Sequence, residues 1–322
     1  MATDSAANSS TRFGHREPWL RSFVAFARPH TLIGTTLSVL ALFALAWIAE
    51  RHRVPGTPLL TLVVALAACL GANIYIVGLN QLFDVEIDRV NKPDLPLASG
   101  AFSRRDAWGA VGAAGTVGLL MGGVGGGFLW VTVWLSLAIG TAYSLPPLRL
   151  KRFPALAALC ILLVRGPVVN LGLFLHFRRA LGGPAQITPE VWGLCAFVLA
   201  LAVVIALFKD IPDIVGDRQY RVLTFAVRFG RETIFRLSQA ILVLSYLSLT
   251  LAAALWMPGV HVEVLAAAHL GALAWALVQG RGLTQRAPEA LLRLQYREYY
   301  RTIWRLFYLE YLAFPVACAL SR

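Results

Sequence analysis

The sequence predicts an all-α polytopic membrane protein with about nine transmembrane helices in a bundle around a lipid-accessible cavity. Its composition is the first reason: the 322 residues are 58% hydrophobic and only 14% charged, which is typical of membrane proteins. Uninterrupted apolar runs such as LLTLVVALAACL are the second. They exclude a β-barrel, whose strands alternate in polarity, and in lipid the remaining way to satisfy the backbone is a helix.

The apolar segments have the length needed to cross a membrane, which is about 20 residues for a hydrocarbon core of about 30 Å. The predicted spans are residues 29–49, 58–79, 107–124, 126–143, 154–177, 190–208, 234–256, 261–279 and 303–320. Residues 1–20 are polar and predict a disordered tail, and residues 21–322 predict a single domain. The four cysteines, Cys69, Cys160, Cys195 and Cys318, fall inside spans without short spacing and are interpreted as apolar core residues.

Most of the basic residues are predicted to lie on one side of the membrane. The formal net charge is +12, yet the Lys and Arg residues do not form one patch of the kind that binds nucleic acid. With the N-terminus on the cytoplasmic side, 23 of the 29 lie in the tail or in loops on that side. This is the positive-inside pattern. Arg165 lies inside the fifth span.

Two polar clusters lie where an apolar segment ends. They contain Asn80, Asp84 and Asp88 in NQLFDVEIDR, and Asp210, Asp213 and Asp217 in KDIPDIVGDR. The spacing is i, i+4, i+8 in the first and i, i+3, i+7 in the second, so each predicts one face of a helix end. Carboxylates at this spacing repel one another unless a cation neutralises them. Both clusters follow even-numbered spans and therefore face the same side of the membrane.

The two clusters repeat one another at an offset of 129 residues. The offset places Asp84 on Asp213, Asp88 on Asp217, and Arg89 on Arg218. This repeat predicts two half-sites, residues 80–89 and 209–218, that converge on one ligand. Oxygen ligands without histidine or thiolate favour Mg²⁺, which commonly binds carboxylates together with phosphate. Solvated loop charges are the alternative for any one residue, but they do not explain the repeat and the shared side together.

The chain resembles the UbiA-type intramembrane prenyltransferases through NxxxDxxxD after the second span and DxxxD after the sixth. Longer blocks are most similar to the branch of that family that prenylates homogentisate. They are NQLFDVEIDRVNKPDLPLASG, GTAYSLPPLRLKRF, LVRGPVVNLGLFLHF, VVIALFKDIPDIVGDR and IWRLFYLEYLAFP. The resemblance runs from residue 80 to residue 315 and so covers most of the chain.

The resemblance implies that Mg²⁺ and basic residues withdraw diphosphate from a prenyl diphosphate, with phytyl favoured. Homogentisate attacks the resulting cation and loses its carboxyl group as CO₂, which gives 2-methyl-6-phytylbenzoquinol in tocopherol biosynthesis. A photosynthetic or plasma membrane is implied. One Mg²⁺ is expected on Asn80, Asp84 and Asp88, and the other on Asp213 and Asp217 with help from Asp210. The basic residues expected to neutralise diphosphate are Arg89, Lys92, Arg149, Lys151, Lys209 and Arg218.

Four further residues are candidates with less specific signals. Tyr143 is expected either to stabilise the developing cation or to be an interfacial tyrosine. Arg165 is expected to anchor diphosphate or the acceptor carboxylate, because an ionisable group inside a span is costly. His30 could reach the mouth of the cavity and bind the acceptor. Glu310 is unusual in an apolar segment and has no assigned role.

Other functions remain open from the sequence. A related enzyme could use geranylgeranyl or longer diphosphates, or another aromatic acceptor such as 4-hydroxybenzoate. A membrane transporter of an organic anion is the alternative outside enzymes. It would be expected to bind near the midplane between broken helices, whereas the acidic clusters lie near one surface.

Overall fold

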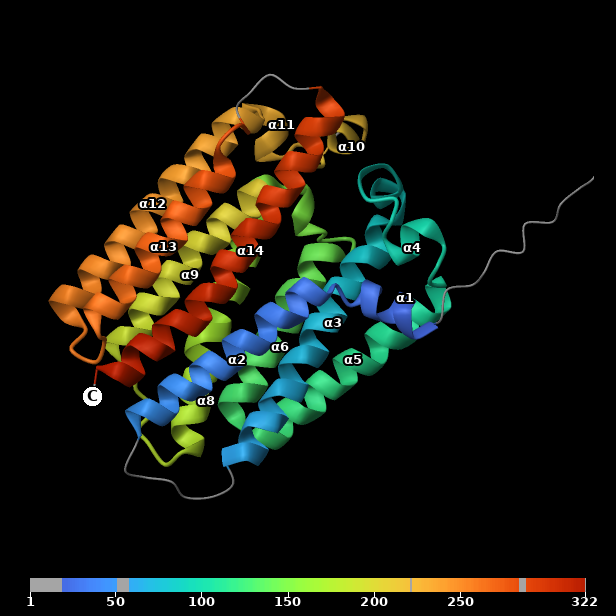
Figure 1. Ribbon diagram of the computed structural model, residues 1–322. Helices are drawn as coiled ribbons and strands as arrows, with labels where there is room; N and C mark the ends of the chain where they lie inside the picture. The colour runs from blue at the N-terminus through green and yellow to red at the C-terminus, as the bar shows by residue number, and fades with distance from the viewer. Residues whose placement is uncertain (1–18, 51–57, 221, 284–287, 322) are drawn as a thin grey trace, which may run out of the picture.

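The computed structural model describes residues 19–50, 58–220, 222–283 and 288–321, and every regular element in these ranges is a helix (Figure 1). Nine helical segments in the described residues are long and apolar enough to cross a membrane, as predicted. They are α2 (Pro29–Ala49), α3 (Pro58–Asn91), α5 (Arg104–Gly125), α6 (Gly127–Ser144), the continuous α7 (Pro154–Leu163), η2 (Val164–Val168) and α8 (Val169–Ala180), α9 (Pro189–Phe208), α12 (Arg231–Trp256), α13 (Val262–Gly280) and α14 (Glu289–Leu320).

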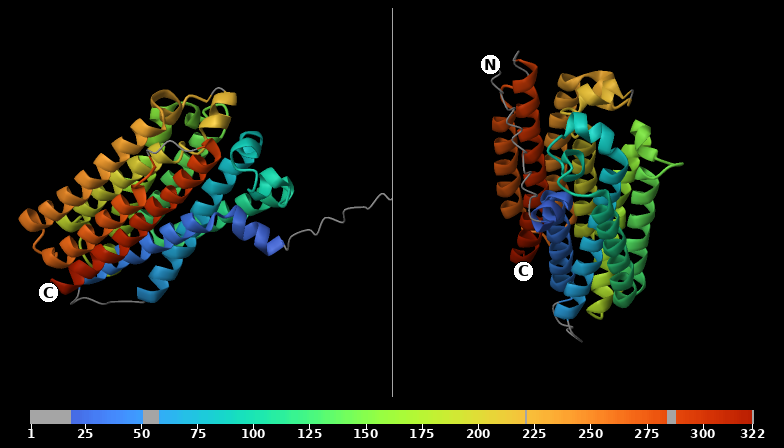
Figure 2. Two further views of the ribbon diagram at one scale, coloured as in Figure 1. Left: turned by 45° about the horizontal axis from the view of Figure 1, so that its top comes forward. Right: turned by 90° about the vertical axis from the view of Figure 1, so that its right-hand side faces the viewer.

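Short elements gather at one end of the bundle. They are α1 (Trp19–Phe26), α4 (Pro96–Ser99), η1 (Leu150–Arg152), α10 (Ile214–Gln219) and α11 (Phe225–Phe229). Figures 1 and 2 show α10 and α11 at the end opposite the one where α14 finishes. The tail predicted at residues 1–20 lies outside the described residues except for Trp19 and Leu20, which begin α1.

Prolines mark the start of four spanning segments. Pro29, Pro58, Pro154 and Pro189 each open a helix, where the missing N–H is not needed and the fixed φ suits the first turn. Two helices extend beyond their predicted spans, because hydropathy detects the membrane and not the end of the helix. Helix α3 continues through the first acidic cluster, as the spacing of that cluster predicted, and ends at Asn91. Helix α14 begins at Glu289 instead of residue 303.

The second acidic cluster does not lie on one continuous helix, so that part of the prediction was wrong. Helix α9 ends at Phe208, residues 209–213 form turns, and α10 begins at Ile214. Pro212 accounts for the break, since it lacks an N–H and disfavours helical backbone at the residue before it. Asp210 therefore lies in the turn and Asp213 at the N-terminal boundary of α10.

Two apolar cores hold the bundle together. The larger runs along most of the spanning helices and includes Leu42, Phe174 and Phe314. The smaller contains Phe26 and Phe102 and fixes α1 and the segment after α4 against α3 and α5. The four cysteines are free and buried, as expected.

Glycines allow α3 and α5 to approach closely. A Cβ on Gly71 would lie 2.7 Å from the carbonyl oxygen of Ala114 and 2.9 Å from the backbone nitrogen of Gly118. Small residues at such crossings are common in membrane helix pairs. The close crossing fixes α3, which carries the first acidic cluster, and α5 then turns into α6 through Gly126, whose φ is +98°.

We expect Gly71→Ala to destabilise the protein, because the added methyl group would have to displace backbone atoms of α5. Overpacking of this kind costs about 1–3 kcal/mol. Gly112→Ala on α5 is the matched control, since nothing lies within 4 Å of its Cβ position. The measurement is the thermal unfolding midpoint in detergent. Equal midpoints for the two variants would contradict the close crossing.

Candidate active site

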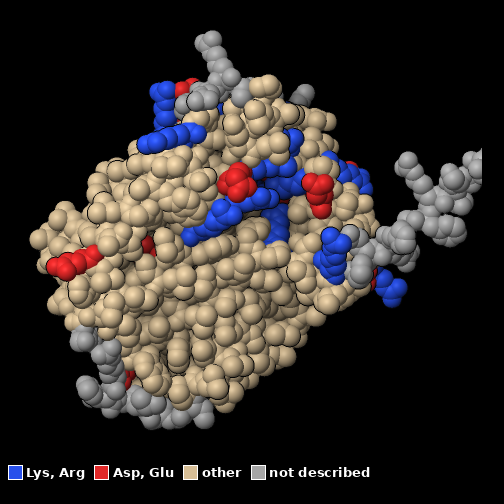
Figure 3. All heavy atoms as spheres, in the orientation of Figure 1, with Lys and Arg blue, Asp and Glu red and all other residues tan. Residues whose placement is uncertain are grey.

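One cavity of about 1490 Å³ lies at the end of the bundle that carries the short helices. Figure 3 shows basic side chains gathered toward this end and around a hollow, while most of the remaining visible surface is uncharged. Both predicted half-sites face this cavity. The predicted site residues that line it are Asn80, Asp84, Asp88, Lys92, Tyr143, Arg149, Lys151, Lys209, Asp210, Asp213 and Asp217.

Three predicted residues lie off the cavity wall. Arg89 is exposed and pairs with Glu86 at 2.8 Å. It follows Asp88 directly, so the helical rotation of about 100° per residue turns it away. Arg218 is exposed in the same way on α10 and lies at a separate surface depression. Arg165 lies behind the wall, next to Trp304.

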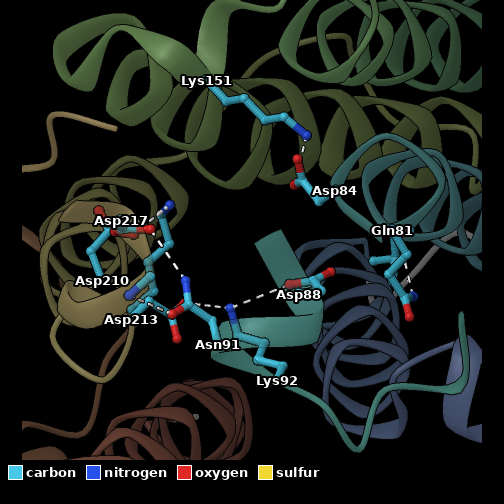
Figure 4. A network of polar contacts seen from close by, with 12 residues as sticks. Gln81, Asp84, Asp88, Asn91, Lys92, Lys151, Asp210, Asp213 and Asp217 are labelled. Carbon is cyan, nitrogen blue, oxygen red and sulfur yellow. Dashed lines mark hydrogen bonds and ion pairs between the residues drawn. The ribbon is translucent and has the colours of Figure 1, made fainter. Parts of the chain in front are cut away.

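Asp84 on α3 is held by two cations that come from the segment after α6. Lys151 Nζ lies 2.7 Å from Asp84 Oδ2, and Arg149 Nη2 lies 3.3 Å from Oδ1 (Figure 4, which labels Lys151 and Asp84). Burial lowers the pKa of Lys151, although Asp84 acts in the opposite direction. These contacts join residues 65 and 67 positions apart in the sequence.

Lys92 links the two half-sites. Its ammonium group donates to Asp213 and lies 3.9 Å from Asp88 Oδ1. Figure 4 shows Lys92 and Asn91 between Asp88 on one side and the second cluster on the other. Burial disfavours the charged ammonium, but Asp213 and Asp88 outweigh it and raise the pKa of Lys92. This lysine therefore neutralises a carboxylate from each half-site.

The second cluster is tightly packed and strongly charged. Lys209 Nζ lies 2.9 Å from Asp210 Oδ1. Burial raises the pKa of Asp210 although Lys209 opposes the shift, and the pKa of Lys209 lies well above its usual value because Asp210 outweighs burial. Burial, together with repulsion from Asp210 and Asp213, raises the pKa of Asp217 to about 7. The carboxylates repel one another, which favours binding of a further cation.

Asn91 connects the half-sites directly and was missed in the sequence. It is 2% exposed. Its side chain donates to Asp217 Oδ1 at 3.3 Å and accepts from the backbone N–H of Gly216 at 3.1 Å. A Cβ on Gly216 would lie 2.2 Å from Asn91 Oδ1, so only glycine allows this approach. Asn91 lies three residues after Asp88, and this spacing could have placed it on the same helix face.

Two arginines on the cavity wall have left-handed backbone conformations. Among the described non-glycine residues, positive φ occurs at Arg28 (53°) and Arg149 (36°), and both line the cavity. Such a conformation costs about 1–2 kcal/mol and often occurs at functional sites. Arg28 was also missed, although its position just before Pro29 is a visible signal.

The oxygen ligands fit a hard divalent cation such as Mg²⁺ in kind. Asp213 Oδ1 is buried and has no hydrogen-bond partner in the described structure. The described residues do not, however, contain a preformed group of three or more His, Cys, Asp or Glu side chains that could hold a metal. Instead, Lys92 pairs with Asp213, and Lys151 pairs with Asp84.

Residues 37–297 match the model of the UbiA prenyltransferase family. The chain belongs to this family. It is 46% identical over 301 residues to a homogentisate phytyltransferase from Synechocystis sp., covering 92% of this chain and 96% of the relative. It is 40% identical to a homogentisate solanesyltransferase from Arabidopsis thaliana, over 90% of this chain and 75% of the relative. It is 37% identical to a homogentisate geranylgeranyltransferase from Triticum aestivum, over 92% of this chain and 72% of the relative.

Solved UbiA structures share the fold. A UbiA homolog from Archaeoglobus fulgidus bound to GPP and Mg²⁺ aligns with a TM-score of 0.60 at 18% identity, over 92% of this chain and 99% of the homolog. A UbiA homolog from Aeropyrum pernix K1 aligns with a TM-score of 0.57 at 21% identity, over 91% of this chain and 96% of the homolog. The all-α fold predicted from the sequence is confirmed for this UbiA-family protein.

We expect Asn91→Ala to raise the Mg²⁺ concentration that gives half-maximal prenyl transfer by about 10-fold, a typical effect of losing a residue that orients metal ligands. Asp94→Ala is the matched control, because Asp94 is exposed and does not line the cavity. The assay follows product formation in membranes over a range of Mg²⁺. An unchanged Mg²⁺ requirement would mean that Asn91 does not position the second half-site.

Proposed function

We propose that this UbiA-family protein transfers a prenyl group, with phytyl favoured, from its diphosphate to homogentisate in a Mg²⁺-dependent reaction. The product is 2-methyl-6-phytylbenzoquinol, an intermediate of tocopherol biosynthesis. The observation that carries the proposal is the meeting of two half-sites across one basic cavity. The 46% identity to a homogentisate phytyltransferase supports the choice of donor and acceptor.

The first half-site would hold one Mg²⁺ and the second half-site another. The ligands are Asn80, Asp84 and Asp88 in the first, and Asp213 and Asp217 in the second, with Asp210 beside them. Bound Mg²⁺ would supply positive charge that stabilises the diphosphate as it leaves. The donor set of carboxylate and amide oxygens supports this assignment.

The lysines of the cavity have a second role in this proposal. Lys92 and Lys151 pair with carboxylates in the structure, and they would pair with diphosphate oxygens once those carboxylates bind metal. Lys209 and Arg149 line the same cavity. The bond between the prenyl carbon and oxygen breaks, and its electron pair leaves with the diphosphate. Arg89 and Arg218 take no part, since they point away.

The remaining steps form the product. The prenyl cation is attacked by a ring carbon of homogentisate, and that carbon then loses its proton. The carboxyl group leaves as CO₂, and the methylene carbon that carried it gains a proton to become methyl. Tyr143 lines the cavity, with its ring centroid 6.0 Å from Lys151 Nζ, and its π face is suited to stabilise the cation.

The membrane setting suits the donor. Moving a chain of about twenty carbons into water would cost more than about 10 kcal/mol at about 0.8 kcal/mol per CH₂. Apolar surroundings also keep water from capturing the cation. The distribution of basic loops supports a cavity that opens on the cytoplasmic side of a photosynthetic or plasma membrane. Relatives named for geranylgeranyl and solanesyl transfer make these donors the alternatives to phytyl.

We expect Asp84→Asn and Asp213→Asn each to reduce turnover by at least about 100-fold, because each removes a carboxylate ligand of the Mg²⁺ that would stabilise the leaving diphosphate. EDTA should abolish activity. The assay supplies membranes with Mg²⁺, homogentisate and phytyl diphosphate and measures the prenylated quinol. Glu298→Gln is the control, since this side chain pairs with Arg301 at the surface. Full activity in either aspartate variant would exclude the two-half-site model.

The same assay with other substrates tests the donor and acceptor. We expect kcat/KM to be highest with phytyl diphosphate, compared with geranylgeranyl and solanesyl diphosphates, and product to form with homogentisate but not with 4-hydroxybenzoate. A higher kcat/KM with geranylgeranyl or solanesyl diphosphate would mean that phytyl diphosphate is not the preferred donor. A preference for 4-hydroxybenzoate would contradict the proposed acceptor.

A further inference from the structure

Arg165 is a cation inside a spanning segment without an acidic partner in the described structure. Its guanidinium carbon lies 4.5 Å from the ring centroid of Trp304 and 5.5 Å from that of Phe307. Tyrosines are its other electrostatic neighbours. An arginine inside a membrane span is costly and usually functional, so its surroundings suggest that a ligand supplies the missing negative charge.

Arg178 lies in the same span but, unlike Arg165, pairs with an acidic side chain. It donates to Glu50 at 2.9 Å and to the carbonyl oxygen of Gln186 at 2.7 Å. Its charge is therefore satisfied within the protein, and a structural role explains it. This explanation does not apply to Arg165.

The backbone around Arg165 is distorted and firmly held. It lies in the π-helical turn η2, which contains Pro167, and such turns are frequent at functional sites. Asn170 donates to the carbonyl oxygens of Arg165 at 2.6 Å and of Gly166 at 2.9 Å, and it accepts from the hydroxyl of Tyr311 at 2.7 Å. These contacts hold the backbone of the turn that carries Arg165.

The Trp304 indole contacts both Arg165 and two residues that line the cavity. The ring of His30 lies 5.0 Å from Trp304 in an edge-on arrangement, and the ring of Tyr300 lies 6.4 Å from it. Both His30 and Tyr300 line the cavity. The indole Nε1 of Trp304 is buried and has no hydrogen-bond partner in the described residues. A donor without a partner and a cation without a counter-ion thus lie together behind the cavity wall.

We propose that Arg165 and the Trp304 indole N–H form the subsite for the carboxylate of the aromatic acceptor, with Tyr300 and His30 beside its ring. This inference rests on the proposed function and identifies how the same site selects an aromatic acceptor that carries a carboxylate. The planar guanidinium suits a carboxylate, which it binds through two parallel hydrogen bonds. The aromatic residues provide edge and face contacts for the acceptor ring.

The subsite also explains how donor and acceptor are kept apart. The lysines that would bind diphosphate pair with the aspartates of the two half-sites. Arg165 instead lies among aromatic rings and has no acidic partner in the described part of the chain. An acceptor held by its carboxylate at Arg165 points its ring away from that anchor and into the cavity, where the prenyl cation forms.

The test compares Arg165→Met with the unaltered protein in steady-state kinetics. We expect the KM for homogentisate to rise at least about 10-fold, because a hydrogen-bonded charge pair is lost, while the KM for phytyl diphosphate stays unchanged. The unaltered protein should prefer homogentisate over its methyl ester, and the variant should lose this preference. Arg165→Lys should recover part of it. Arg301→Met is the control, a surface cation on α14 that pairs with Glu298.

The possible outcomes separate the hypotheses. A raised KM for phytyl diphosphate with an unchanged KM for homogentisate would assign Arg165 to diphosphate and overturn the subsite. An unchanged preference over the methyl ester would leave Arg165 a structural cation and overturn it too. No turnover of homogentisate by the unaltered protein would instead refute the proposed function. If Arg165→Met does not fold, Trp304→Phe is the second variant. It removes the indole N–H together with part of the ring, and we expect about a threefold rise in the homogentisate KM with an unchanged KM for phytyl diphosphate.

Discussion

The carboxylates of the two half-sites face one cavity at the end of an apolar bundle, and their charges have to be neutralised. Asp84 pairs with Lys151, and Asp213 with Lys92. Asp84 and Lys151 are 67 residues apart in the sequence, and Lys92 and Asp213 are 121 residues apart. The ion pairs therefore fix the loop after α6, the end of α3 and the turn before α10 around the same space.

The need to neutralise these carboxylates also connects the structure to the proposed reaction. In the proposed reaction, Mg²⁺ would replace the lysines as the partner of these carboxylates, and a diphosphate would replace the carboxylates as the partner of the lysines. A substrate that brings metal and phosphate together can therefore exchange these ion pairs for new ones without leaving any charge unpaired in an apolar setting. Asn91 contacts Asp217 and Gly216, and these contacts would keep the two half-sites at a fixed separation during the proposed exchange.

Much of this arrangement could be predicted from the sequence. Hydropathy located the spans because burial in lipid requires long apolar runs, and loop parity placed both clusters at one end. The spacing of Asn80, Asp84 and Asp88 predicted that the helix continues past its apolar residues. The start of α14 at Glu289 was missed, because a helix can begin in water before its apolar residues. The break at Pro212 was visible in the sequence but was not used. Asn91 and Arg28 act through contacts between distant segments, and local spacing does not show such contacts.

We propose that two half-sites on different elements hold one metal-bound diphosphate. The decisive measurement is the number of Mn²⁺ ions bound to the purified protein in the presence of inorganic diphosphate, counted by electron paramagnetic resonance. We expect two Mn²⁺ per chain, and one fewer after either Asp84→Asn or Asp213→Asn. Unchanged Mn²⁺ binding in both variants, or none in the unaltered protein, would contradict it.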